Sequence, residues 1–245
     1  MESFDFVEGL VIRGGIDVMI LNGISLHGGL CSSWVASSWT AKQVVPAVVG
    51  HWRKHGLPRY AQFDNDTIFQ GAHQWPDSFG RITRMCLQLG VVPVFVPPRE
   101  TGFQAAIESY NGRWQAKVWR RFEHDSLATL QGHSDRYVAA ARVKSAARRD
   151  AAPARRRFPA NWKLDLQKPL AGTVIFLRRT NERGVVELLG RSYPVDPLWP
   201  HRLVRAEVDL SGGEIRFYRL RRREPTQQPL IRTVAYQTPK KRFHE

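Results

Sequence analysis

Residues 98–111 read Pro98-Arg99-Glu100-Thr101-Gly102-Phe103-Gln104-Ala105-Ala106-Ile107-Glu108-Ser109-Tyr110-Asn111. The prolines and the glycine at the start predict a loop, and the residues after them predict a long helix. Apolar side chains recur at helical spacing and should form the core face of this helix: Ile107, Tyr110, Trp114, Val118 and Phe122. Glu108 lies one turn into the helix, with Gln104 one turn before it and Asn111 three residues after it, so the three polar groups share a face.

The chain before this helix predicts a mixed sheet with helices packed on it. Three short strands at 4–12, 16–21 and 29–37 read as an antiparallel meander, and a helix follows from Thr40 to Gly56, with Pro46 as a point where it can kink. A short strand at 60–63, a helix at 77–89 and a buried strand at 91–96 come next. This order predicts an α/β fold with a mixed five-stranded sheet in residues 1–147.

The chain after this helix predicts a second, smaller domain. One more helix runs from Ser126 to about Ala147, and an arginine-rich connector follows at 148–170. Short alternating strands at 172–177, 185–189, 203–208 and 214–218, separated by glycine-bearing turns, predict a small all-β barrel-like domain over 171–223. Residues 224–245 are polar and basic, and we expect a flexible tail there.

The charge of the chain predicts a polyanionic partner. The 37 Lys and Arg against 22 Asp and Glu give a net charge of +15 and a pI near 10.6. Residues 1–100 carry 8 basic and 8 acidic side chains, so the whole excess lies in residues 101–245. DNA is the partner that we expect, and a solvated basic face is the alternative.

Other parts of the composition exclude several classes of protein. Neither a membrane span nor a signal peptide is visible, so we expect a cytoplasmic protein with no membrane partner. Cys31 and Cys86 stand alone, which predicts buried free thiols rather than a disulfide framework or a zinc site.

Three acidic residues occupy strand ends or a helix start: Asp5 in the first strand, Asp64 after the fourth, and Glu108 in the long helix. Carboxylate oxygens suit Mg²⁺ or Mn²⁺, and a carboxylate trio is the minimum equipment for metal-assisted phosphodiester cleavage. Each residue also has a plainer interpretation. Asp5 can lie on the polar face of its strand, Asp64 can make an Asx turn or cap, and Glu108 can be a solvated helix residue.

Two segments resemble a known family. Gln62-Phe63-Asp64-Asn65-Asp66-Thr67-Ile68-Phe69 is similar to the Asp-Asn-Gly-x-x-Phe segment of the integrase core, and residues 98–111 are similar to its Pro-x-x-x-Gly-x-x-Glu-x-x-Asn helix. The strand around Asp5 looks like the opening strand of that family. Over residues 1–125 the chain therefore resembles DDE-type insertion-sequence transposases, which have a retroviral integrase catalytic core.

The resemblance implies an RNase H-like fold and two Mg²⁺ or Mn²⁺ ions held by Asp5, Asp64 and Glu108. It also implies nicking of transposon ends, strand transfer to target DNA by the freed 3′-hydroxyl, homo-oligomers on DNA, and association with the nucleoid. The alternatives are a plain metal nuclease and a non-catalytic DNA-binding remnant or regulator.

The chain departs from the family in three ways. Asp66 stands where the family commonly has glycine, and the stretch between Asp64 and Glu108 is longer than usual, which indicates an insertion around 71–79. The chain also begins almost at its first catalytic strand, so we expect the N-terminal helix-turn-helix region of the family to be absent.

Polar and basic side chains predict the DNA contacts. On the long helix these are Gln104, Asn111, Arg113, Lys117, Arg120 and Arg121. In the connector and after the last predicted strand, beside Phe217 and Tyr218, they are Arg155, Arg156, Arg157, Arg221, Arg222 and Arg223. We expect Trp52, Trp114 and Trp119 to be core residues rather than base-stacking platforms.

Overall fold

The structure, a computed structural model, describes residues 1–71, 76–239 and 242–243. The chain divides into two compact units, each built from two segments. Unit 1 comprises Met1–Gln62 and Thr101–Phe158, and unit 2 comprises Phe63–Glu100 and Pro159–Glu245. The insertion predicted around 71–79 and the tail predicted at 224–245 fall partly on residues 72–75, 240–241 and 244–245, which lie outside the described residues.

The sheet of unit 1 has the order β3-β2-β1-β4, and its first three strands form the predicted meander. β1 (Glu2–Ile12), β2 (Ile16–Ser25) and β3 (Cys31–Ala36) pair antiparallel. β4 (Tyr60–Phe63) pairs parallel with β1 through Glu2↔Ala61 and Ser3↔Gln62. The mixed character predicted for the sheet is therefore confirmed.

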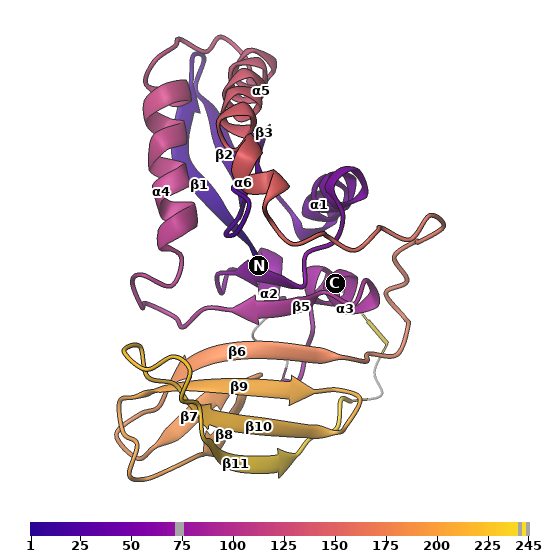
Figure 1. The fold of residues 1–245 in the computed structure, drawn as a ribbon, viewed down its shortest axis with the longest axis vertical. Helices are drawn as coiled ribbons and strands as arrows, with labels where there is room; N and C mark the ends of the chain where they lie inside the picture. The colour runs from indigo at the N-terminus through magenta and orange to yellow at the C-terminus, as the bar shows by residue number, and fades with distance from the viewer. Residues whose placement is uncertain (72–75, 240–241, 244–245) are drawn as a thin grey trace. The chain divides into compact units, whose positions relative to one another are not determined.

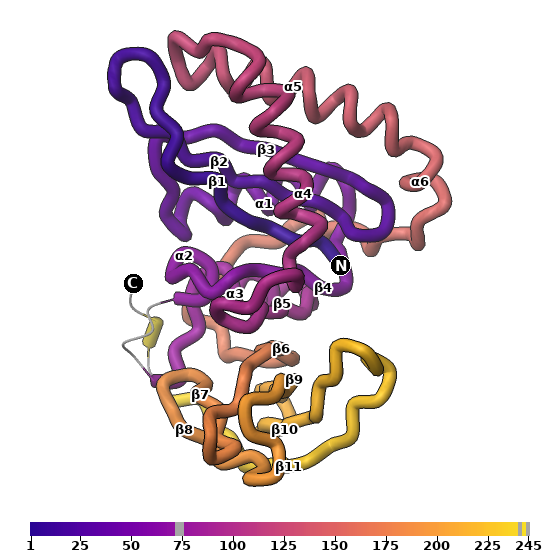
Figure 2. Tube along the Cα trace, turned by 90° about the vertical axis from the view of Figure 1, so that its left-hand side faces the viewer, coloured from indigo at the N-terminus to yellow at the C-terminus, as the bar shows by residue number. Residues whose placement is uncertain are grey.

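Helices cover the two faces of this sheet. Neighbouring residues of β1 point to opposite faces, so that each face has side chains on which a helix can pack. On one face, α1 (Ala41–His55) packs through Trp52, whose ring meets Phe4 edge-on at 6.2 Å. On the other face lie α4 (Ala105–Trp114), the π-helical segment η1 (Gln115–Trp119) and α5 (Leu127–Lys144), with the short α6 (Ala146–Asp150) after them. Trp114 and Val118 join Val7 and Ile20 in a buried core cluster. Figures 1 and 2 show α4 and α5 beside β1, β2 and β3.

Unit 2 contains strands that pair in the order β5-β6-β9-β10-β11 (Figure 1). Its strands are β5 (Val92–Phe95), β6 (Thr173–Arg179), β9 (Leu203–Asp209), β10 (Glu214–Arg219) and β11 (Leu230–Ala235), and β7 (Val185–Leu188) forms a separate hairpin with β8 (Arg191–Pro194). Two helices belong to this unit, α2 (Thr67–Gln70) and α3 (Arg81–Gln88). Pro93 lacks a backbone N–H, and β5 accommodates it because the residue pairs of β5 with β6 begin one residue later, at Val94↔Ile175.

The small all-β barrel-like domain expected over 171–223 is not confirmed. The ladder β5-β6-β9-β10-β11 is open among the described residues, and β6 pairs with β5 from an earlier part of the chain. This pairing explains why residues 63–100 cluster with the C-terminal strands. The domain limits proposed at 147, 170 and 223 stay a prediction.

Three local predictions were wrong. The helix expected over 77–89 begins only at Arg81, because Asp77 has a positive φ of 57° and its buried carboxylate binds Arg191. Phe122 is 42% exposed rather than core, since the chain leaves the helix at Arg120. The segment expected to be a flexible tail contains β11, which pairs antiparallel with β10.

The predictions for Trp52 and Trp114 and for the two cysteines were confirmed. Trp52 and Trp114 are fully buried, whereas Trp119 is half-buried and stacks on His124. Cys31 and Cys86 are buried free thiols. Among the described helices, none has both the length and the apolar character that crossing a membrane requires.

Buried Glu2 anchors the arginine-rich connector to unit 1. Its carboxylate accepts hydrogen bonds from His51 at 2.8 Å, from Trp52 at 2.7 Å and from Arg155 at 2.7 Å. Leu57 and Arg156 form a β-bridge beside this cluster. Burial by itself would raise the pKa of Glu2, but His51 and Arg155 outweigh it and hold the pKa at about 2. The start of the connector is therefore a docked segment.

We predict that Glu2 makes unit 1 acid-sensitive. Its folded pKa of about 2 lies below the ordinary 4.5, so its stabilisation is complete above pH 4.5 and is lost as the pH falls towards 2. Between pH 5 and pH 3 the parent should lose about 2 kcal/mol more unfolding free energy than Glu2→Gln. Urea unfolding at both pH values measures this difference. An equal loss in the two proteins would show that Glu2 is not held as a buried carboxylate.

Candidate active site

Asp5 is held by a chain of buried amides. It lies half-buried on β1, directly opposite Asn22 on β2. Asn111 on α4 donates from Nδ2 to Asp5 Oδ2 at 2.7 Å, and Asn22 donates from Nδ2 to Asn111 Oδ1 at 2.8 Å. Because an ionised carboxylate only accepts hydrogen bonds, Asn111 must turn its NH₂ group to Asp5 and its oxygen to Asn22. The chain therefore fixes the orientation of one carboxylate edge.

Glu108 lies on the stripe of α4 that faces this part of β1. Residues 104, 108 and 111 follow one another at spacings of four and three and share one helix face. Gln104 donates to the carbonyl of Phe4 at 3.4 Å, and Asn111 donates to Asp5. Glu108 stands between these two contacts in sequence, and its side chain is exposed. Gln104 and Asn111 thus contact β1 from one face of α4, and the role expected of Glu108 stays a prediction.

Asp64 is the second residue of unit 2, directly after β4. It is half-buried, and its Oδ1 accepts from the backbone N–H of Asp66 at 3.1 Å, so the Asx turn considered from the sequence is present. The end of β4 thus places Asp64, and its role as a metal ligand stays a prediction.

Asp66 has a structural role that separates it from Asp64. It is the N-cap of α2, and its Oδ1 accepts from the backbone N–H of Ile68 at 2.7 Å. The side chain of the intervening Asn65 donates to the carbonyl of Val96 at 2.7 Å. The helix cap accounts for the acidic residue at position 66, which leaves Asp64 as the better candidate for metal binding.

The three predicted carboxylates are of the type that binds a divalent metal ion, but they do not form a complete metal site among the described residues. Asp5, Asp64 and Glu108 offer the carboxylate oxygens that Mg²⁺ and Mn²⁺ prefer. Within the described ranges, no group of three or more His, Cys, Asp or Glu side chains is arranged to hold a metal ion. The oriented carboxylate of Asp5 is the part of the predicted trio whose surroundings are organised in advance.

A basic groove runs between α4 with η1 and α5 with α6. It has a volume of about 680 Å³. Its cationic side chains come from both sides and comprise Arg113, Lys117, Arg121, Arg136, Lys144 and Arg148. Tyr110, Tyr137 and Phe122 also line it, and no carboxylate does. Of the basic residues predicted on the long helix, the groove brings together Arg113, Lys117 and Arg121 but not Arg120.

The remaining predicted basic residues lie in different surroundings. Arg155, Arg156 and Arg157 line a second cavity of unit 1, about 1140 Å³ in volume, but the charge of Arg155 is matched by Glu2. In unit 2, Arg221 pairs with Glu224 at 3.0 Å and Arg222 pairs with Glu100 at 2.8 Å. Phe217 is fully buried, so it is not a stacking platform. The DNA contacts assigned to these arginines stay a prediction.

Two groups of residues near the site were not predicted from the sequence. Asn22 lies on β2, and only the pairing register reveals that it faces Asp5. Arg136, Lys144 and Arg148 approach the helix that carries Glu108 from α5 and α6. Their spacing of eight and four residues along the chain indicates that the three side chains lie on the same side of a helix.

No protein-family model matches the chain, and no curated protein matches it. Among solved structures, it is similar to the catalytic core domain of BIV integrase, with 17% identity, a TM-score of 0.41, and coverage of 53% of this chain and 77% of that chain. The HTLV-2 integrase catalytic core domain in complex with magnesium gives 11% identity, a TM-score of 0.43, and coverage of 56% and 81%. A simian T-cell lymphotropic virus intasome in complex with a PP2A regulatory subunit gives 10% identity and a TM-score of 0.44. The match covers 88% of this chain and 70% of that chain. Since these TM-scores lie below 0.5, the function proposed below rests on the residues of this chain.

We predict that Asn22→Ala destabilises unit 1 by about 1–3 kcal/mol, because Asn111 Oδ1 loses its donor in a buried place. The matched control is Ser32→Ala, which removes a buried hydroxyl that has no hydrogen-bond partner among the described residues. The control should change the unfolding free energy by less than about 0.5 kcal/mol. Urea unfolding compares the two variants, and equal effects would mean that Asn22 does not hold Asn111.

Proposed function

We propose that this protein is a polynucleotidyl transferase of the transposase and integrase kind, which nicks DNA ends and joins them to target DNA. The observation that carries the proposal is the 2.7 Å hydrogen bond from Asn111 to Asp5. It ties the helix of Glu108 to the strand of Asp5 in the order that the resemblance to DDE-type transposases requires. If Glu108 were only a solvated helix residue, its helix would not need a hydrogen bond to the strand of Asp5.

Asp5, Asp64 and Glu108 are the proposed ligands of two Mg²⁺ or Mn²⁺ ions. When bound, such ions lower the pKa of an attacking water or 3′-hydroxyl and neutralise charge on the phosphate in the transition state. The side chains of this chain have two further roles. Asn111 keeps the Asp5 carboxylate in one orientation, and Gln104 ties the start of the helix to the backbone of β1.

The basic groove is the proposed DNA-binding surface of unit 1. Six cationic side chains without a carboxylate among the lining residues suit the phosphate backbone of a nucleic acid. Three of them lie on α4, η1 and the turn that follows, C-terminal to Glu108, so that bound DNA would extend away from the catalytic helix start. We further propose that the protein acts as a homo-oligomer, because two DNA ends must be handled together.

The test of catalysis uses a short labelled duplex that carries a candidate transposon end, with Mg²⁺, Mn²⁺ or EDTA. The parent should nick and join DNA only with metal, and Asp5→Asn, Asp64→Asn and Glu108→Gln should fall to the level seen with EDTA. Asn111→Ala should lose about 10–100-fold in rate, as expected when the partner that orients a ligand is removed.

Two controls accompany these variants. Glu123→Gln changes an exposed carboxylate outside the site and should keep full activity. Asp66→Ser keeps an oxygen that can cap α2 and should also stay active. Nicks without joined products would indicate a plain nuclease. DNA binding without cleavage under any metal would favour the non-catalytic remnant and contradict the proposal.

We predict that the double variant Lys117→Gln/Arg136→Gln weakens DNA binding and lowers its salt dependence. Each phosphate contact contributes about 0.9 to the slope of log K against log salt, so the slope should fall by about 2. Fluorescence anisotropy across a salt series measures it. Arg13→Gln removes an exposed arginine outside the groove and should leave the slope unchanged. A slope equal to that of the parent would exclude the groove as the binding surface.

A further inference from the structure

Arg178, on β6 of unit 2, is a buried cation without an acidic partner. It is 8% exposed. Its NH1 atom donates to the carbonyls of Leu177 at 2.8 Å and Val96 at 3.3 Å, and its guanidinium lies 5.0 Å from the centre of the Phe176 ring. Among the described residues it forms no ion pair, whereas the next residue, Arg179, pairs with Glu100. The Nε and NH2 donors of Arg178 remain for another acceptor.

The charge of Arg178 is retained at neutral pH. Burial lowers the pKa of the guanidinium to about 10. A buried charge is costly unless a counter-charge or a full set of hydrogen bonds accompanies it. Two carbonyl acceptors satisfy only part of a group with five N–H donors. An external anion is the missing component that this environment favours.

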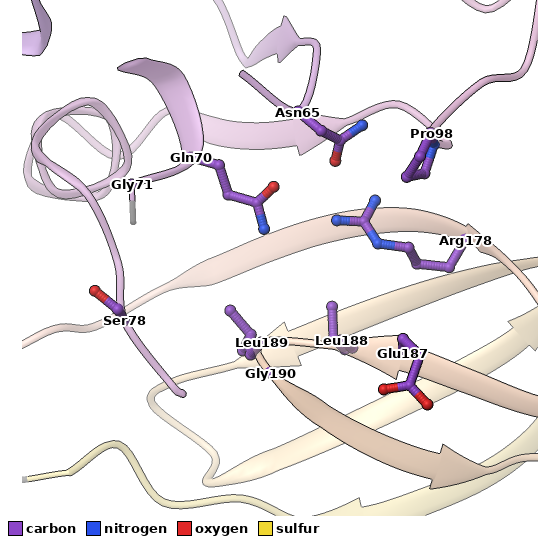
Figure 3. A pocket seen from close by; sticks show the side chains of 10 residues that line it. All are labelled: Asn65, Gln70, Gly71, Ser78, Pro98, Arg178, Glu187, Leu188, Leu189 and Gly190. Carbon is purple, nitrogen blue, oxygen red and sulfur yellow. The ribbon is translucent and has the colours of Figure 1, made fainter. Parts of the chain in front are cut away.

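Arg178 opens into a pocket of about 390 Å³ within unit 2. Figure 3 shows its guanidinium directed towards the side chains of Asn65 and Gln70, which converge on the same space from the opposite wall. Gln70 is 8% exposed, and its Oε1 has no hydrogen-bond partner within the part of the chain that the structure describes, so its amide can rotate to present the NH₂ group to an anion. The backbone of Gly71 continues this wall.

The acidic residue in the pocket lining does not neutralise Arg178. Glu187 directs its carboxylate away from the guanidinium in Figure 3, and this carboxylate accepts a hydrogen bond from the Ser192 hydroxyl at 2.5 Å. The space between Arg178 and Gln70 is therefore lined by donors on a positively charged background. It is also larger than a chloride ion or a single water molecule requires.

We propose that this pocket binds a phosphate group, held by the guanidinium fork of Arg178 with the amide of Gln70 on the opposite wall. A planar guanidinium with parallel N–H donors matches two oxygens of a phosphate, and the amide N–H of Gln70 matches a third. The source of the phosphate is either a nucleic-acid strand or a free phosphate ester. The lining residues all belong to unit 2, and phosphate binding there needs no cleavage chemistry.

The test is a thermal-unfolding titration of the full chain with inorganic phosphate at constant ionic strength. At ten times its dissociation constant, phosphate should raise the Tm of the parent by about 3 °C, whereas chloride should not. Arg178→Met, which keeps the length and apolar stem of the side chain, should abolish this shift. The matched control Arg183→Met removes an exposed arginine of the same unit and should retain it.

A second variant and two further ligands complete the test. The variant covers the case in which Arg178→Met does not fold, and the ligands distinguish a nucleic-acid strand from a free phosphate ester. Arg178→Lys keeps the charge without the fork, and it should need at least about tenfold more phosphate for the same shift. A single-stranded oligonucleotide that binds the parent more tightly than a nucleoside monophosphate, with the difference lost in Arg178→Lys, identifies a strand phosphate. The reverse order identifies a free ester. A parent that phosphate does not stabilise, or a shift unchanged in both Arg178 variants, overturns the proposal while leaving the catalytic one intact.

Discussion

The amide of Asn111 joins three elements of unit 1, because it receives a hydrogen bond from β2 through Asn22 and gives one to Asp5 on β1. A helix that packs only through apolar side chains can slide or rotate at small cost, whereas a buried amide has one arrangement that satisfies both of its ends. The rotation of α4 is thereby set. The hydrogen bond of Tyr110 with Ser33 and the buried side chains of Ile107 and Trp114 hold the same helix, which carries Glu108 and one side of the basic groove.

Positive charge in this protein has two kinds of use. Some arginines are structural, as the ion pairs of Arg155 with Glu2 and of Arg191 with Asp77 illustrate. Other cations, such as Lys117 and Arg136, gather in a groove whose lining includes no carboxylate, and Arg178 is buried without an ion-pair partner among the described residues. Net charge alone therefore overstates the DNA-binding surface. Only the unmatched cations are candidates for phosphate contacts.

The sequence predicted the elements of unit 1 well, because their apolar patterns are regular and local. β1 to β3, α1 and α5 were all visible in this way. Contacts between distant segments were not, since pairing is chosen by tertiary packing: neither the facing of Asn22 and Asp5 nor the ladder of β5 with β6 follows from local pattern. The candidate carboxylates came from a resemblance of motifs, and the amides that orient one of them came only from the structure.

Joint binding of a divalent metal ion by Asp5, Asp64 and Glu108 is proposed, and Mn²⁺ binding measured by electron paramagnetic resonance tests it. The signal of free Mn²⁺ should fall as the parent, supplied with DNA, binds the ion. Asp5→Asn, Asp64→Asn and Glu108→Gln should each weaken that binding at least about tenfold, while Glu123→Gln should not. Binding of Mn²⁺ that is equally strong in the parent and in all three site variants would contradict the account.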